Sequence, residues 1–190
     1  MIFPIVAYGD PVLKKKAKRI DPDHPGLDAL IAGMYDTMYN AQGVGLAAPQ
    51  IGRPIRLFVV DAAPFAEGEE EDAEALKAFK KTFINAEILE ESGDAWSFTE
   101  GCLSIPEIRE DVQRQAQIHI RYQDEEFETH EETYSGLIAR VVQHEYDHIE
   151  GRLFTDKLSP LKKQLLKGRL NSIAKGKIRP DYPMKFPQAK

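Results

Sequence analysis

Residues 140–154 read RVVQHEYDHIEGRLF and place two histidines four positions apart. Because one turn of an α-helix takes about 3.6 residues, His144 and His148 would face the same way and could bind one metal ion together. Glu145 would lie one step round the helix, where it is free to act as a base. The motif therefore predicts a helical metal site with a proton acceptor beside it.

The spacing of the apolar residues around the motif also favours a helix. One face of that helix would carry Leu137, Val141, His144 and His148. The neighbouring face would carry Ile138, Val142, Glu145 and Ile149. The pattern predicts a helix from about Ser135 to Glu150, with Ser135 as its N-cap and with the imidazoles on the face toward the core. The alternative, a helix with surface histidines that bind nothing, does not explain the intervening glutamate.

Two histidines leave the site incomplete, because a hydrolytic metal usually has three protein ligands and one position for water. Phe154 stands where a metzincin protease would have a third histidine, and no His or Glu follows Glu150. The third ligand is therefore expected upstream. Cys102, in TEGCLSIPE, is favoured because a thiolate binds borderline-soft divalent metals strongly. The other upstream histidines, in positions typical of loops and polar strand faces, are His24, His119 and His130.

Three segments carry a resemblance to a known family. GVGLAAPQIG (43–52), EGCLSIPE (100–107) and QHEYDHIEG (143–151) resemble, in order and spacing, the signature segments of peptide deformylases. The likeness extends over nearly the whole chain, and an acidic stretch at about 64–80 fits it less well. The chain is therefore similar to a bacterial-type deformylase, an enzyme that removes the formyl group from the N-terminal methionine of a newly made polypeptide and releases formate.

The resemblance also implies roles for particular residues. The metal ligands would be Cys102, His144 and His148, and Fe(II) would be the natural metal, with nickel, cobalt or zinc as substitutes. Glu145 would move protons, while the Gln50 amide and the Leu103 backbone N–H would stabilise charge on the formyl oxygen. The methionine pocket and its approach would involve Gly43, Val44, Gly45, Phe98, Leu137 and Val141.

Arg140 departs from the pattern of many relatives, which have an apolar residue four positions before the first histidine. We expect its aliphatic stem to pack in the pocket wall and its guanidinium group to reach solvent.

The glycines of GVGLAA also match a weak dinucleotide-binding pattern, G-x-G-x-x-A. A true fingerprint follows a strand and opens a helix, whereas this one follows a predicted helix and leads toward a strand. We expect Gly43 and Gly45 either to let the backbone pass close to a ligand, with Gln50 turned into the site, or to form a plain turn.

The fold is expected to be α+β, with antiparallel strands packed around the central HExxH helix in a single catalytic domain, residues 1–190. An N-terminal amphipathic helix is predicted at 28–41, ended by Gly43, and a basic helix near Ser159-Pro160 opens a tail at about 159–190. Strands are predicted at 55–62, 81–91, 95–99, 116–124 and 127–134. The acidic stretch at 64–80 is expected to be a solvated insertion between strands.

Composition narrows the class of protein. The chain has 190 residues, 42% of them hydrophobic, and no apolar run long enough to span a membrane. We expect a cytoplasmic protein, since the start has no signal-like segment and one cysteine permits no internal disulfide. The net charge of −6 is not the basic charge that general or sequence-specific nucleic-acid binding would require, so we expect neither kind of binding.

The C-terminal tail differs in charge from the rest of the chain. Residues 157–190 contain ten Lys or Arg residues and one acidic residue, Asp181. The apolar set of the tail helix, expected to dock on the body, is Leu161, Leu165, Leu166 and Leu170. Its basic face could contact the ribosome, whose RNA phosphates attract lysine and arginine, or could merely offset an acidic body.

Two other functions fit the motif. A different metallopeptidase would use the same water chemistry, and it would release amino acids from unformylated peptides. A structural zinc module would need a fourth protein ligand, for which the sequence offers no convincing candidate.

Overall fold

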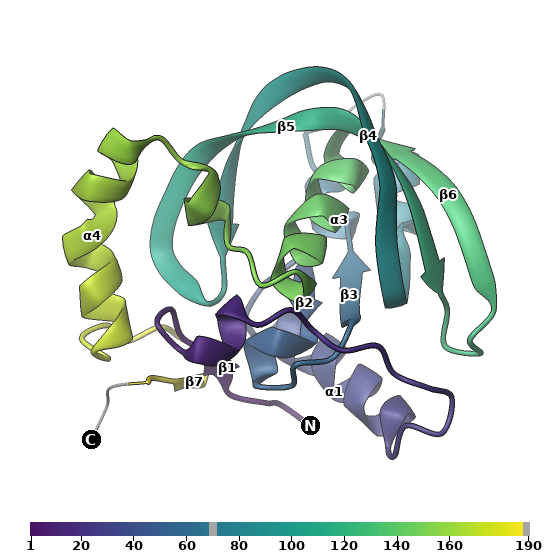
Figure 1. Ribbon diagram of the computed structural model, residues 1–190, viewed down its shortest axis with the longest axis horizontal. Coiled ribbons are helices and arrows are strands. Elements are labelled where there is room, and N and C mark those ends of the chain that lie inside the picture. The colour runs from purple at the N-terminus through teal and green to yellow at the C-terminus, as the bar shows by residue number, and fades with distance from the viewer. Residues whose placement is uncertain (69–71, 188–190) are drawn as a thin grey trace.

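A computed structural model describes residues 1–68 and 72–187. Its main feature is a five-stranded antiparallel sheet in the order β2-β3-β4-β5-β6, which arches over a central helix, α3 (Gly136–Ile149) (Figure 1). The strands are β2 (Gly45–Ala47), β3 (Leu57–Asp61), β4 (Lys80–Cys102), β5 (Ile105–Gln123) and β6 (Thr129–Ser135). The predicted α+β class is confirmed, and antiparallel strands pack around the helix that contains residues 144–148.

Helix α3 is largely buried because it packs against β2, β3, β5 and β6. The predicted bounds are confirmed to within one residue at each end. Ser135 is the N-cap residue, as predicted, although its side chain makes no capping hydrogen bond. The chain instead enters the helix through Gly136, at φ +59°, and leaves it through Gly151, at φ +73°. Left-handed glycines therefore flank the helix at both ends.

Strand β4 is longer than the sequence pattern indicates. The predicted strands at 81–91 and 95–99 form one strand, and β5 begins at Ile105 rather than at 116. The sequence Ser92-Gly93-Asp94 resembles a turn, but here it forms a register shift against β5, with Gly93 at φ +79°. Such irregularities bend a strand without ending it, which allows β4 and β5 to curve over α3.

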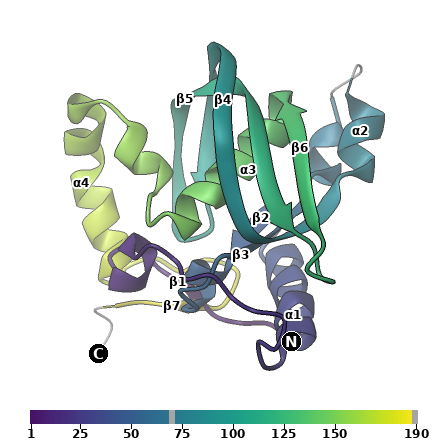
Figure 2. The same cartoon turned by 45° about the vertical axis from the view of Figure 1, so that its right-hand side comes forward.

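Helix α1 (Leu27–Asn40) lies below the sheet and packs on β2 and β3 (Figure 2). Its apolar face confirms the predicted amphipathic helix. The residue that ends it is Gln42, at φ +55°, and not Gly43 as predicted. The Gly43 N–H bonds to the Met38 carbonyl at 2.9 Å, which closes a helix terminus of Schellman type.

The acidic stretch lies between β3 and β4, as predicted, but it is not solvated throughout. It contains a 3-10 turn at Ala63–Ala66 and a short helix, α2 (Ala73–Ala78), and residues 69–71 lie outside the described part. Leu76 of α2 is fully buried against the main core, so α2 is anchored to the body.

The C-terminal helix α4 (Pro160–Ala174) begins where the sequence predicts, with the Ser159 hydroxyl accepting a hydrogen bond from the Lys162 N–H. Leu166 and Leu170 are buried, but Leu161 and Leu165 are 70% and 72% exposed. The prediction that all four leucines dock is therefore wrong, because α4 stands at the side of the molecule and only one narrow face of it touches the body (Figure 1).

Short elements complete the chain. They are β1 (Ile5–Val6), β7 (Met184–Lys185) and 3-10 turns at Pro11–Lys14, Ala48–Ile51 and Phe154–Lys157. Strands β1 and β7 pair in parallel, so the two ends of the described chain lie side by side. Within residues 1–68 and 72–187, none of the helices has the length and apolar character needed to cross a membrane.

The end of α3 provides a test of this packing. A Cβ added at Gly151 would lie 2.6 Å from the Lys14 carbonyl oxygen, in a left-handed conformation that other residues rarely adopt. We expect Gly151→Ala to lower the free energy of unfolding by about 2–4 kcal/mol, measured by urea denaturation.

Gly168→Ala, in the interior of α4, is the matched control, because a Cβ there has nothing within 4 Å. It should raise stability by about 0.5–1 kcal/mol through helix propensity. Equal effects of the two substitutions would contradict the packing at Gly151.

Candidate metal centre

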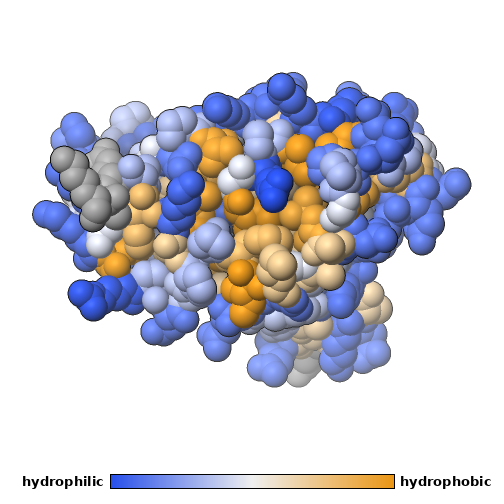
Figure 3. Space-filling view, turned by 90° about the horizontal axis from the view of Figure 1, so that it is seen from below, coloured by the Kyte–Doolittle hydropathy of each residue, from blue (hydrophilic) through white to orange (hydrophobic). Residues whose placement is uncertain are grey.

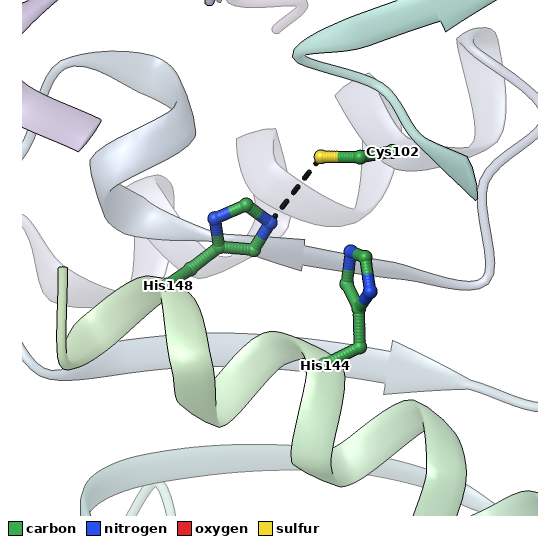
Figure 4. Close-up of side chains that lie close together, drawn as sticks. All are labelled: Cys102, His144 and His148. Atoms are coloured by element: carbon green, nitrogen blue, oxygen red, sulfur yellow. Dashed lines mark hydrogen bonds between the residues drawn. The ribbon is translucent and has the colours of Figure 1, made fainter. Parts of the chain in front are cut away.

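Three possible metal-binding side chains converge between α3 and the end of β4. His144 and His148 project from one face of α3 toward Cys102, the last residue of β4 (Figure 4). Their ligand atoms all lie within 4.8 Å of one another, and Cys102 Sγ is 3.4 Å from His148 Nε2. A tetrahedral ion with bonds of about 2.0–2.3 Å holds its ligand atoms about 3.3–3.8 Å apart. The Cys102–His148 pair already has this spacing, and the wider pairs would have to close by at most about 1 Å for the cluster to hold a transition metal.

The chemistry of the donors supports this fit. One sulfur and two imidazole nitrogens suit zinc, iron, cobalt or nickel better than calcium or magnesium. The cluster formed within the described part of the chain has three members, which leaves a coordination position for water or substrate, as in a catalytic site. Two of the other upstream histidines contact residues outside the cluster. His119 contacts Glu131 and Thr133 on the outer face of the sheet, and His130 contacts Asp124.

Glu100 orients the first histidine. It is two residues before Cys102 on β4, and its Oε2 accepts a hydrogen bond from His144 Nδ1 at 2.8 Å. With Nδ1 donating to the carboxylate, Nε2 is the nitrogen left to bind a metal. Burial opposes ionisation of Glu100, but hydrogen bonds from His144 and Arg114 hold its pKa well below the usual range.

Arg114 of β5 connects Glu100 to the helix. Its Nε donates to Glu100 at 2.6 Å, and its Nη1 donates to Asp147 of α3 at 2.7 Å. All three side chains are at most 8% exposed. Sequence reasoning missed Arg114, although the sequence contained a signal. Alternate residues of a strand face the same side, and Arg114 alternates with the buried Val112, Ile118 and Ile120 on the side of β5 that faces the core. A charged side chain in such a position needs a buried partner.

Arg140 does not reach solvent, so the expectation for its guanidinium group is wrong. The residue is 2% exposed and lies with its guanidinium carbon 4.6 Å from the centre of the Trp96 ring. Its Nη1 donates to Glu100 Oε1 at 3.0 Å and to the Val112 carbonyl, and its Nη2 donates to the Trp96 carbonyl at 2.7 Å. These acceptors lie under the β4–β5 arch, and they replace the water that an exposed guanidinium would bind.

Glu145 is buried beside the cluster. Its Oε2 has no hydrogen-bond partner among the described residues, and burial raises its pKa to about 7. A nearby divalent cation would favour the carboxylate form. A Cβ at Gly45 of β2 would lie 2.7 Å from Glu145 Cδ, so this glycine makes room for the carboxylate. In the same way a Cβ at Gly43 would lie 2.8 Å from Leu103 Cδ1. At both glycines the backbone therefore passes close to a side chain of the protein itself: Glu145 at Gly45 and Leu103 at Gly43.

The two histidines differ in their surroundings. Burial opposes the charge on His144, but its hydrogen bonds to Cys102 and Glu100 raise its pKa above the ordinary value. Burial and the neighbouring His144 lower the pKa of His148, whose Nδ1 has no partner in the described part of the structure. A bound cation would compete with a proton at His144, because a ligating imidazole must be neutral.

Gln50 and Leu103 lie at the rim of the cluster. Gln50 Oε1 accepts from the Ala47 N–H at 2.9 Å, which directs Nε2 toward Cys102 Sγ at 3.5 Å and Ser104 Oγ at 3.3 Å. Leu103 and Ser104 form the two-residue turn between Cys102 and Ile105. Both predicted donors are therefore close to the sulfur.

The cluster opens into a cleft of about 900 Å³. Of the residues predicted for the methionine pocket, the cleft wall includes Gly43, Val44, Gly45, Phe98 and Val141. Leu137 is not part of this wall and packs instead against the main core. Arg140 and the C-terminal residues 179–182 also line the cleft, and sequence reasoning assigned no such position to 179–182.

A helix with an HExxH motif, a cysteine on a neighbouring strand close to both histidines and a buried carboxylate beside an open cleft are features typical of a metal-dependent hydrolase. The family model described as Polypeptide deformylase matches residues 2–164. The chain is 64% identical to the peptide deformylase of Christiangramia forsetii over 193 aligned positions, which cover 100% of this chain and 98% of that protein. It is 61% identical to the enzyme of Flavobacterium psychrophilum, over 98% and 97% of the two chains.

Solved structures agree with these sequence matches. The peptide deformylase of Legionella pneumophila superimposes with a TM-score of 0.79 at 37% identity, over 94% of this chain and 99% of that one. That of Thermotoga maritima gives 0.74 at 39% identity, over 84% and 99%. The chain belongs to the peptide deformylase family. It is a metalloenzyme that removes the formyl group from the N-terminal methionine of newly made polypeptides.

The buried charges beneath the cluster generate a stability prediction. Arg114→Met would leave both Glu100 and Asp147 without their main partner in a region closed to water. We expect the free energy of unfolding to fall by about 3–5 kcal/mol, measured by urea denaturation.

Arg121→Met is the control on the same strand. Arg121 pairs with Glu131, and both side chains are half exposed, so the loss should stay below about 1 kcal/mol. A loss of similar size in both variants would show that the Arg114 network contributes no more than a surface ion pair.

Proposed function

We propose that Cys102, His144 and His148 hold the catalytic metal and that Glu145 is the proton-transfer group of deformylation. The observation that carries this proposal is the convergence of the three ligand atoms within 4.8 Å, beside a buried carboxylate with an unpartnered oxygen. The chemistry that a divalent cation supplies at such a site is Lewis acidity, which polarises a carbonyl group and makes water nucleophilic near neutral pH.

Glu145 moves protons in both halves of the reaction. It takes a proton from the water that attacks the formyl carbon and later gives one to the departing amine, as formate and a free N-terminus separate. Its burial supports this role, because a raised pKa makes the carboxylate a stronger base, and a pKa near the working pH lets the same group accept a proton and later release it. Gly45 keeps the carboxylate against β2, since any side chain there would displace it.

Gln50 and Leu103 stabilise the charge that develops on the formyl oxygen. The Gln50 amide oxygen is anchored on the Ala47 N–H, so its Nε2 is directed toward Cys102 before substrate arrives. The Leu103 backbone N–H follows the cysteine directly. Donors fixed in advance need little reorganisation during the reaction, which is why such groups contribute strongly to catalysis.

The cleft accommodates the methionine and the first residues of the peptide. We infer that the side chain lies among Gly43, Phe98 and Val141, with Val44 and Gly45 beside the peptide backbone. Strand β2 is at the edge of the sheet, so an extended peptide can add to it by main-chain hydrogen bonds. Leu137 supports Val141 from the core side and does not touch substrate.

We infer that the natural metal is Fe(II), with nickel, cobalt or zinc as substitutes. A thiolate donates more charge than an imidazole, so this ligand set does not by itself select zinc. Cys102 is half-buried at the cleft wall, and an accessible thiolate beside iron would make the enzyme sensitive to peroxide.

The role of Glu145 is tested by Glu145→Gln in protein purified without oxygen. Metal content, measured by elemental analysis, should stay at the wild-type value, and in the wild type we expect one Fe(II) per chain. Formate release from formyl-Met peptides should fall by about 10²–10⁴-fold, because the glutamine cannot accept a proton.

Glu90→Gln, on the exposed part of β4, makes the same change away from the cleft and should leave both quantities unaltered. Loss of the metal from Glu145→Gln would show that Glu145 is a ligand. Zinc in the anaerobic wild type would refute the choice of iron and leave the residue roles intact.

The whole chain, residues 1–190, forms one catalytic domain in this proposal, and it acts in the cytoplasm, where newly made formylated chains emerge. We infer that α4 contacts the ribosome. Lys163 and Lys167 are exposed on this helix together with Leu161 and Leu165, which gives a mixed basic and apolar surface. Ribosomal RNA phosphates attract such a surface through counterion release.

Charge reversal tests this contact. The double variant Lys163→Glu/Lys167→Glu should cosediment with ribosomes about tenfold less at low salt and keep full activity on free peptides. Lys15→Glu/Lys18→Glu changes the net charge equally at exposed positions near the N-terminus and should pellet like the wild type. Equal pelleting of all three proteins would refute the contact.

A further inference from the structure

The chain folds back on itself after α4. A turn at Gly176, with φ +67°, reverses its direction, and residues 177–187, here termed the C-terminal strap, run along the lower side of the molecule (Figure 1). The strap is held by β-sheet pairing: the Ile5 N–H donates to the Pro183 carbonyl at 2.8 Å, and the Ala7 N–H donates to the Lys185 carbonyl at 2.9 Å.

Apolar contacts add to this pairing. Four partly buried side chains of the strap pack on the cores around α1 and α4: Ile178, Tyr182, Met184 and Phe186. Figure 3 looks onto this lower face and shows apolar residues gathered across its middle. The strap is therefore a packed element of the body.

The strap also forms part of the active-site cleft. Residues 179–182 line the cleft together with Leu103 and with 105–109 of β5. The match to the family model ends at residue 164, so the strap lies beyond the region that carries the family's signature segments.

Tyr182 makes the most direct contact between the strap and the catalytic residues. Its hydroxyl donates a hydrogen bond to the Leu103 carbonyl oxygen at 2.8 Å. Burial, together with the negative charge of Cys102 and Glu107, raises the pKa of Tyr182, so the phenol stays protonated and remains a donor.

The turn that receives this bond is held from three sides. The Ser104 carbonyl accepts from the Tyr8 N–H at 2.8 Å, and the Ser104 hydroxyl lies 3.3 Å from Gln50 Nε2. Leu103 precedes Ser104, and the only side-chain hydrogen bond to its backbone within the described residues comes from Tyr182. Cys102 on one side is held in the metal cluster. The Leu103 carbonyl and the Leu103 N–H belong to neighbouring peptide planes that meet at the Leu103 Cα. Because Cys102 and Ser104 hold the two ends of this stretch, fixing the Leu103 carbonyl limits rotation about the Leu103 φ and ψ angles and so limits how far the N–H can turn.

We propose that Tyr182 is a positioning residue for deformylation: its hydroxyl fixes the Leu103 carbonyl and thereby keeps the Leu103 N–H aimed at the formyl oxygen. The proposal rests on the donor role inferred for Leu103. In this proposal the strap contributes to catalysis, because it contains Tyr182 and because its pairing with β1 holds the Tyr182 hydroxyl beside Leu103.

Tyr182→Phe removes the hydroxyl and keeps the ring. We expect kcat for a formyl-Met peptide to fall about tenfold and KM to change less than about twofold, the pattern of an interaction that matters mainly in the transition state. Hydrogen exchange of backbone amides in residues 102–105, measured by mass spectrometry, should become about fivefold to tenfold faster. Metal content should match the wild type.

Tyr35→Phe is the matched control. It also removes one partly buried tyrosine hydroxyl, which bonds to Thr82 of β4 at 3.2 Å, and neither residue lines the cleft. It should leave kcat and the exchange of residues 102–105 unchanged. An equal fall in kcat in both variants would overturn the proposal, because the effect would then be general loosening of the fold.

The two measurements also separate the proposal from its premise. Unchanged exchange at residues 102–105 in Tyr182→Phe would overturn the positioning role of Tyr182. Faster exchange with unchanged kcat would instead overturn the donor role of Leu103, on which the proposal rests. A rise in KM with unchanged kcat would make Tyr182 a substrate-binding residue and equally overturn the positioning role.

Discussion

The active site depends on one buried carboxylate, that of Glu100. Three donors from β5 and α3 converge on its two oxygens: Arg114, Arg140 and His144. An isolated charge would be very costly in this position, and these partners make it tolerable. Glu100 also precedes Cys102 by two residues on β4. The same group therefore orients the ring of His144 and is close to Cys102 on one strand, so the spacing between the Cys102 sulfur and the His144 imidazole is coupled to the packing of the sheet on the helix.

The buried charges beneath the site balance one another. Beneath Cys102, His144 and His148, the negative charges of Glu100 and Asp147 are matched by Arg114 and Arg140, so this layer adds little net field. Burial raises the pKa of Glu145 beside it. A divalent cation held at the three side chains would favour the carboxylate form of Glu145.

The sequence was sufficient to predict the HExxH helix, because the spacing of His144 and His148 and the apolar stripes depend on local geometry alone. It was also sufficient for α1 and for the start of α4, where Ser159 is the cap. The failures involve contacts distant in sequence. The burial of Arg140 depends on carbonyls of β4 and β5, which lie at least 28 residues away along the chain. The exposure of Leu161 depends on where α4 stands relative to the body, and helical periodicity does not contain that information. The Tyr182 contact joins residues 79 positions apart.

The parallel pairing of β1 with β7 has a consequence for the order in which the protein can mature during its own synthesis. Ile5 and Val6 leave the ribosome early, but their partners Met184 and Lys185 are added nearly 180 residues later. Until then, one wall of the cleft is missing and the hydroxyl that contacts Leu103 is absent. Contacts of such long sequence separation form late in folding. A copy still being translated therefore contains Cys102, His144 and His148 before it contains residues 179–182, which complete the wall of the cleft.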